Sequence, residues 1–98
     1  MVEFCFDKGK LHDIHNSMVR TLPRHVISPC IVEITYPEDY CIDNTDYITQ
    51  AVLQALKGYL INDDTRKSVL GLVQLFHGGH KKKLNMYKNK IIVRVIEA

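Results

Sequence analysis

The sequence predicts a small α+β domain of the α/β type, with a mixed four-stranded sheet and one or two helices in the order β-α-β-α-β-β. Its 98 residues, 46% of them hydrophobic, suit a single domain over residues 1–98. Four short runs are rich in alternating or branched apolar residues, which is typical of strands. One longer segment has apolar residues at helical spacing.

The first two elements are a strand and a short helix. "VEFCF" at residues 2–6 alternates apolar and polar side chains, which predicts a strand. Residues 8–21 place Leu11, Ile14 and Met18 near helical spacing, and the Leu22-Pro23 step ends that pattern. We therefore expect a short helix after the first strand.

The third element, "CIVEITY" at residues 30–36, is a strand bounded by Pro29 and Pro37. Its apolar side chains fall on both faces, as expected for a strand that is covered on both sides. The sequence therefore predicts that this strand is central.

A helix over residues 46–57 is the clearest element. Apolar residues follow a helical stripe at Ile48, Val52, Ala55, Leu56 and Tyr59. Gly58 is placed to end the helix, and the charge of Lys57 complements the helix dipole.

Two further strands, "SVLGLVQLF" at 68–76 and "KIIVRVIEA" at 90–98, complete the order. Between them lies "HGGHKKKLNMYKN", which contains two adjacent glycines and several lysines. We expect the two strands to form a hairpin with a basic tip.

Composition narrows the class of protein. No run approaches about 18 apolar residues, and the first ten residues lack the apolar core of a signal peptide. Cys5, Cys30 and Cys41 are odd in number and lack CxxC spacing, which favours free thiols over disulfides or a zinc knuckle. We expect a soluble cytoplasmic protein with no membrane association.

Charge is divided along the chain. Between residues 33 and 64 the only base is Lys57, against the acids Glu33, Glu38, Asp39, Asp43, Asp46, Asp63 and Asp64. Between residues 65 and 96 there are no acids, and the bases are Arg66, Lys67, Lys81, Lys82, Lys83, Lys88, Lys90 and Arg94. Folded together, the two segments would place carboxylates beside a cationic surface, which suits a polyanion, although a solvated lysine loop explains the basic run equally well.

Geometry suggests a site for the carboxylates. A helix from Asp46 to Lys57 covers roughly 17 Å, and an extended "GYLIN" after a reversal at Gly58 covers about the same distance back. Asp63 and Asp64 would then return to Asp46 and could bind Mg²⁺ or Mn²⁺. The alternative is that residues 44–46 cap a helix and that "NDDT" is a polar turn.

Residues 44–68 resemble the core of the RusA-like Holliday junction resolvases. The pattern of that family runs Asp-x-Asp-Asn-x-x-Lys, Leu-Asp-Ala-Leu, a glycine and a closing Asp-Asp. "NTDYITQ", "LQAL", Gly58 and Asp63-Asp64 align with it without a gap.

The resemblance implies a metal-dependent dimeric endonuclease that cuts four-way DNA junctions. By position, it implies catalytic residues at Asp46, Asp63 and Asp64, and metal ligands for Mg²⁺ or Mn²⁺ at Asp46, Asp64, Asp43 and Asn44. DNA-binding residues are then expected at Arg66, Lys67, Lys81, Lys82, Lys83 and Lys88. The partners implied are branched DNA and a second copy of the chain.

The motif is incomplete in this chain. Asn44 replaces its first aspartate, Tyr47 its asparagine, Gln50 its lysine and Gln54 its helix aspartate. An amide oxygen brings no charge to a metal, and the lost lysine no longer neutralises a phosphate. Asp43 is the candidate substitute for the first aspartate.

Two hypotheses follow from this pattern. The first is a structure-specific DNA endonuclease with a weakened metal site. The second is a non-catalytic, phage-type accessory or inhibitory module that binds DNA through its basic hairpin or a protein through its acidic face. The histidine pairs His12/His15 and His77/His80 lack a further ligand at zinc spacing, so solvated histidines are the simpler interpretation.

Overall fold

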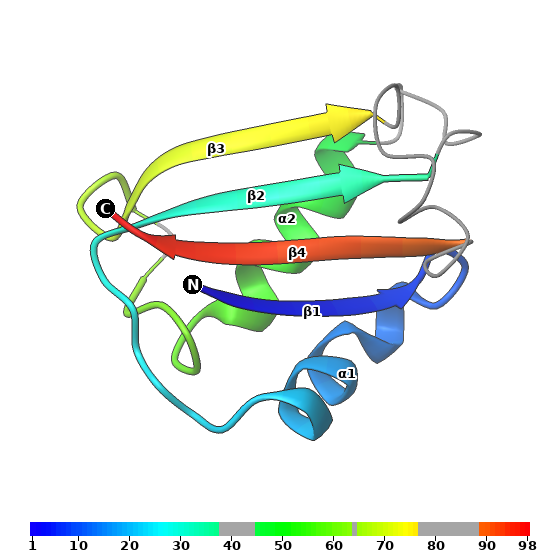
Figure 1. Cartoon of the computed structure of the whole chain (residues 1–98), viewed down its shortest axis with the longest axis horizontal. Coiled ribbons are helices and arrows are strands. Elements are labelled where there is room, and N and C mark those ends of the chain that lie inside the picture. The colour runs from blue at the N-terminus through cyan, green and yellow to red at the C-terminus, as the bar shows by residue number, and fades with distance from the viewer. Residues whose placement is uncertain (38–44, 64, 77–88) are drawn as a thin grey trace.

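The predicted fold class is confirmed in the computed structural model, which describes residues 1–37, 45–63, 65–76 and 89–98 (Figure 1). Within these ranges, four strands form one mixed sheet, accompanied by two α-helices and one 3₁₀ turn. The elements in chain order are β1 (Val2–Asp7), the 3₁₀ turn (Leu11–Asp13), α1 (Ile14–Thr21), β2 (Cys30–Tyr36), α2 (Thr45–Leu56), β3 (Val69–Phe76) and β4 (Lys90–Glu97).

The strand order in the sheet is β1-β4-β2-β3. β4 pairs antiparallel with β1 on one side and with β2 on the other, whereas β3 pairs parallel with β2. The expected hairpin between the last two strands is therefore wrong, because β2 lies between β3 and β4. The parallel pair instead makes a β-α-β unit in which α2 is the crossover, as parallel neighbours require.

Both helices cover the same face of the sheet (Figure 1). Alternate residues of β2 on that face are fully buried at Cys30, Val32, Ile34 and Tyr36. The central position predicted for β2 is confirmed, but its predicted cover on both faces is wrong. Ile31, Glu33 and Thr35 point to the open face and stay partly exposed, since the two helices lie on the other side.

A charged row crosses the open face. Arg94 of β4 forms ion pairs with Glu3 of β1 at 3.3 Å and with Glu33 of β2 at 3.7 Å. The strand register places all three side by side and continues the row into Val73 of β3. Opposite charges on adjacent strands stabilise the pairing where no helix covers the sheet.

Helix α2 begins and ends within a residue of the predicted 46–57. Ile48, Val52 and Leu56 face the sheet and are fully buried, as the helical stripe predicted. The chain leaves the helix through Gly58, whose φ of 78° lies in the left-handed region that glycine adopts without strain.

Helix α1 is shorter than the predicted 8–21. Asp7 accepts two hydrogen bonds, from the Lys10 amide to its carbonyl and from the Gly9 amide to its carboxylate, each at 2.9 Å. These bonds hold residues 7–10 in a turn, so the helical part starts later. Its end before the Leu22-Pro23 step is confirmed.

Candidate functional site

Asp46 lies in the first turn of α2 and is exposed. The position of this turn is fixed beside the last residue of β2, because the Tyr36 hydroxyl donates a hydrogen bond of 3.4 Å to the Thr45 carbonyl. A carboxylate here complements the positive end of the helix dipole. Asp46 therefore lies near the C-terminal end of β2, at that end of the sheet.

Asp63 lies at the other end of α2. Its carboxylate is 3.5 Å from the ammonium of Lys57, the residue that follows the helix. Both side chains are close to half exposed, so the ion pair is of the weak surface kind.

The segment between Lys57 and Asp63 is a compact turn. The Gly58 amide donates to the Ile61 carbonyl at 2.7 Å, and the Ile27 amide donates to the Leu60 carbonyl at 2.7 Å. Leu60 and Ile61 are fully buried. Burial of these two side chains holds the segment against the core, so the extended return predicted for "GYLIN" is wrong.

Asp46 and Asp63 therefore lie at opposite ends of the β-α-β unit. Residues 65–68 follow Asp63 and lie beside the start of β2, because the Cys30 amide donates to the Ser68 carbonyl at 2.9 Å. Asp46 follows the end of β2. Seven residues of strand separate these ends by roughly 20 Å, and a metal ion bound through oxygens at ~2.0 to 2.6 Å cannot bridge them.

The predicted metal site is accordingly not assembled from Asp46 and Asp63 within one subunit. Among the residues that the structure describes, no three His, Cys, Asp or Glu side chains gather where a metal ion could be held. Several predicted residues lie outside the described ranges, namely Asp43, Asn44, Asp64, Lys81, Lys82, Lys83 and Lys88.

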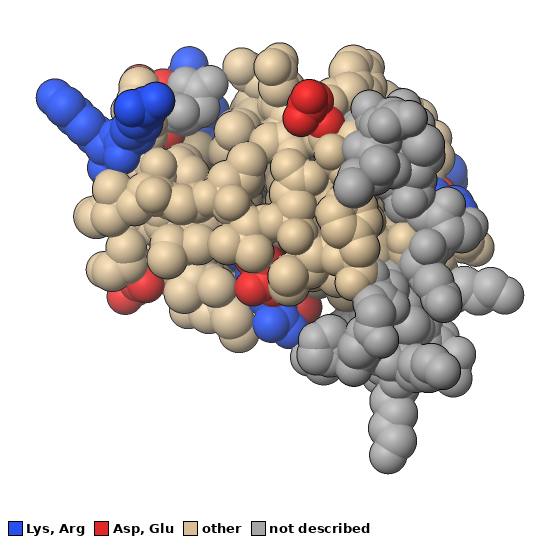
Figure 2. All heavy atoms as spheres, turned by 90° about the horizontal axis from the view of Figure 1, so that it is seen from above, with Lys and Arg blue, Asp and Glu red and all other residues tan. Residues whose placement is uncertain are grey.

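Arg66 and Lys67 are the two predicted DNA-binding residues that the structure describes. Both are exposed on the turn that leads into β3. This turn is closed by hydrogen bonds from the Ser68 and Val69 amides to the Thr65 carbonyl, at 3.1 and 2.9 Å. Figure 2 shows basic side chains projecting at the end of the molecule where β3 begins. Such cations are placed to contact phosphates.

The acids of residues 33–64 do not form one acidic face in the described ranges. Glu33 is paired with Arg94 on the open face of the sheet, Asp46 begins α2, and Asp63 is paired with Lys57 beyond its end. These three acids are separated because the crossover carries the chain from one end of the sheet to the other.

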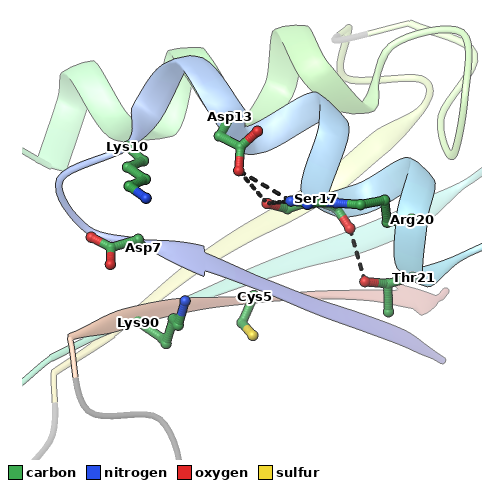
Figure 3. Close-up of a pocket in the computed structure, with 8 residues that line it drawn as sticks. All are labelled: Cys5, Asp7, Lys10, Asp13, Ser17, Arg20, Thr21 and Lys90. Carbon is green, nitrogen blue, oxygen red and sulfur yellow. Dashed lines mark hydrogen bonds and ion pairs between the residues drawn. The ribbon is translucent and has the colours of Figure 1, made fainter.

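A polar cavity of about 360 Å³ lies between β1 and α1 (Figure 3). On its helix side, Arg20 donates to the Asp13 carboxylate at 3.1 Å, and Ser17 donates to the same oxygen at 3.4 Å. The cavity is lined by Cys5, Asp7, Lys10, Asp13, Ser17, Arg20, Thr21 and Lys90. All but one of its residues come from positions 5–21, and Lys90 of β4 is the exception, so only the pairing of β1 with β4 completes it.

The sequence pattern also does not predict the exposure of β3. Five large apolar side chains of this strand are between 38% and 59% exposed, although the strand was expected to be an ordinary member of the sheet. The absence of any charge in "VLGLVQLF" gave no sign that the strand would lie at an edge.

The chain matches no known protein-family model, no curated protein and no solved structure. The likeness to the RusA-like resolvases therefore depends on the motif in residues 44–68. No helix in the described ranges is long and apolar enough to cross a membrane.

Proposed function

We propose that this chain is a RusA-like protein that binds branched DNA as a homodimer in the cytoplasm and does not cut it. One observation carries the proposal. The segment that resembles the resolvase core keeps its helix and its glycine, but two of its retained carboxylates, Asp46 and Asp63, lie at opposite ends of that helix.

The absence of cleavage follows from the chemistry of the remaining groups. The motif's lysine and two of its aspartates are replaced by Gln50, Asn44 and Gln54, which removes charge from the site. Within one subunit, Asp46 and Asp63 do not fit a shared Mg²⁺ or Mn²⁺ ion. We therefore derive no metal-dependent step for this chain.

DNA binding is supported by the exposed cations of the turn before β3. Arg66 and Lys67 project from a turn whose backbone is fixed by hydrogen bonds, so they can meet phosphates without ordering a loop. Each phosphate contact releases counterions, so the affinity falls with salt by a slope near 0.9 per contact. Lys81, Lys82, Lys83 and Lys88 lie outside the described ranges, and the resemblance to the resolvases implies that they also contact DNA.

The test is a gel shift on a four-way junction and on a linear duplex of the same sequence, over a salt series. We expect tighter binding to the junction. Arg66→Gln with Lys67→Gln should lower the salt slope by about two, and replacing Lys81, Lys82 and Lys83 by alanine should lower it by roughly two to three.

The matched control replaces another exposed arginine and another exposed lysine, as Arg24→Gln with Lys10→Gln. It should leave affinity and slope unchanged. If the parent protein binds neither DNA at ~50 mM salt, where such contacts are strongest, the DNA-binding proposal is wrong. A non-catalytic module that binds a protein partner would then be the better explanation.

A second candidate, a junction endonuclease, is favoured by the positional match of Asp46, Asp63 and Asp64 to the motif. Because the first two are far apart in one subunit, such a site would need carboxylates of two subunits. Incubation of a labelled junction with Mg²⁺ or Mn²⁺ decides between the two candidates, and we expect no product.

If product appears, mixing Asp46→Asn protein with Asp63→Asn protein tests the shared site. Activity that each variant lacks alone and the mixture regains would show that two subunits contribute, since one of the two sites in a mixed dimer keeps both carboxylates. Asp64→Asn should also abolish cleavage without unfolding the protein.

A further inference from the structure

Strand β3 exposes more apolar surface than the rest of the described sheet. Leu70 is 59% exposed, and Leu72, Val73, Leu75 and Phe76 are between 38% and 42% exposed. Figure 2 looks onto this edge of the molecule and shows uncharged side chains along most of its length. Together the five side chains expose roughly 400 Å² of apolar surface, and exposed apolar patches of this size are commonly functional.

Among the described strands, β3 is also an edge strand. It pairs with β2 on one side and ends the strand order on the other. Edge strands are usually protected from further pairing by charged side chains, proline or cover from a helix. The opposite edge, β1, has that protection, because it carries Glu3 and Asp7 and packs against α1. β3 has neither charge nor proline.

The strand is regular over most of its length. A register shift occurs between Cys30 and Ile31, and from Gly71 onwards each residue of β3 has its partner in β2. Gly71, Val73 and Leu75 then lie on the open face of the sheet, and Leu72, Gln74 and Phe76 lie on the helix face. A further strand could extend the sheet along this regular part.

We propose that β3 pairs antiparallel with β3 of a second copy, about a twofold axis that passes between the two Val73 residues. This inference rests on the homodimer of the proposed function and names the surface that forms it. It does not depend on DNA binding.

The sequence of β3 is complementary to itself in this register. Residues that face each other across antiparallel strands share a face of the sheet, and here Gly71 lies opposite Leu75 and Leu72 opposite Gln74. Glycine leaves room for the larger leucine: among the described residues, only Ile31 has atoms near the position of an added Cβ, at 3.5 Å or more. At the ends Leu70 lies opposite Phe76.

Charge and area both fit a second copy. A charged residue at position 73 would face its own symmetry mate, and charges of one sign at positions 72 and 74 would face each other, but the strand contains no charge. The two strands together expose about 800 Å² of apolar side-chain surface. Pairing covers their backbone edges and the part of that surface along the shared edge, so the interface falls below the ~1,200 Å² of standard specific complexes, in the range of weak ones. We therefore expect a dimer with a dissociation constant on the order of 1 to 10 µM.

Sedimentation at about 100 µM, above that dissociation constant, tests the interface with a matched pair of variants. Val73→Lys places two ammonium groups across the axis, where facing Cα atoms are only ~4.5 to 5.5 Å apart, and should yield monomers. Val19→Lys makes the same change at a valine of similar exposure, 43% against 40%, on α1 at the other edge of the sheet, and should leave the dimer intact. Circular dichroism checks that both variants are folded.

A second test of the interface introduces no charged side chain. Val73→Cys places two thiols at a separation that suits a disulfide, so mild oxidation should produce a covalent dimer. Val19→Cys should not, and the parent protein with its native cysteines gives the background.

A monomeric parent protein, or a Val73→Lys variant that remains dimeric, would overturn the proposed interface. The gel shift separates this result from failure of the proposed function. A monomer that binds the junction contradicts only the interface, and a β3-linked dimer that binds no DNA contradicts only the function.

Discussion

Strands β2 and β3 are neighbours with similar sequences and opposite surroundings. "CIVEITY" and "VLGLVQLF" are both rich in branched and aromatic residues, and the second is the more apolar of the two. Yet Val32 of β2 is fully buried, whereas Leu72 of β3, its neighbour on the same helix-covered face, is 41% exposed, and Val73 on the open face is 40% exposed. Burial follows position in the sheet. β2 has a strand on each side and α2 against one face, whereas β3 is the last strand in the order and has a neighbour on one side only.

The comparison can be tested with one substitution made in both strands. Val32→Ala should lower the free energy of unfolding by about 2 kcal/mol, because it removes fully buried methyl groups and leaves a cavity. Val73→Ala should lower it by less than about 0.5 kcal/mol when measured on dilute protein. Urea denaturation gives both values. Equal losses would mean that the two strands are equally buried in solution.

A charged row joins β1, β4 and β2 on the open face. Removing its central cation with Arg94→Met leaves Glu3 and Glu33 on either side of an apolar residue. We expect a loss of about 1 kcal/mol in the free energy of unfolding, since these groups are only 19–33% exposed.

The control for that variant is Arg20→Met. The Arg20 side chain is 69% exposed in its pair with Asp13, so its loss should cost less than about 0.5 kcal/mol. If both substitutions cost the same, the open face is as well solvated as the surface of α1, and the row does not stabilise the sheet.

The smallest expected effect concerns the thiol at the start of β2. Burial raises the pKa of the Cys30 thiol. Because the folded pKa exceeds the unfolded pKa, the contribution to stability is constant below about pH 8.5 and is lost as the pH rises above it. Cys30→Ala should remove this decline, which pH-dependent thermal unfolding can measure.

Thiol labelling gives an independent check on the same strand. Cys30 is fully buried and Cys5 is partly exposed. At pH 8, peptide mapping should find Cys5 modified before Cys30, which stays protected until the protein unfolds. Early modification of Cys30 would show that the covered face of β2 opens readily.

Local pattern was sufficient to predict the elements. The stripe from Ile48 to Leu56 and the glycine at position 58 define α2 within a residue, and the prolines on either side of "CIVEITY" define β2. These signals depend on neighbours within a few positions, which a single sequence contains.

The pairing of the strands could not be predicted from local sequence pattern. Cys30 pairs with Glu97 and Val2 with Val95, and nothing local to these residues indicates such partners. The hairpin expected between β3 and β4 was wrong for this reason, because adjacency in sequence was taken for adjacency in the sheet.

The candidate site was mispredicted at one particular turn. The return of Asp63 to Asp46 assumed an extended segment after Gly58, but Leu60 and Ile61 are buried against the core and hold the chain at the far end of α2. The apolar character of these two residues was visible, but the place of their contacts was not.

The insertion of β4 between β1 and β2 affects how this protein can fold during synthesis. Of the described strands, β4 is the last to leave the ribosome, and it provides every hydrogen-bonded contact between β1 and the rest of the sheet. Until it emerges, β2, α2 and β3 can associate as a unit, but β1 and α1 have no strand to join. Pairing of β1 must therefore wait for the synthesis of β4, as is typical of topologies dominated by long-range contacts.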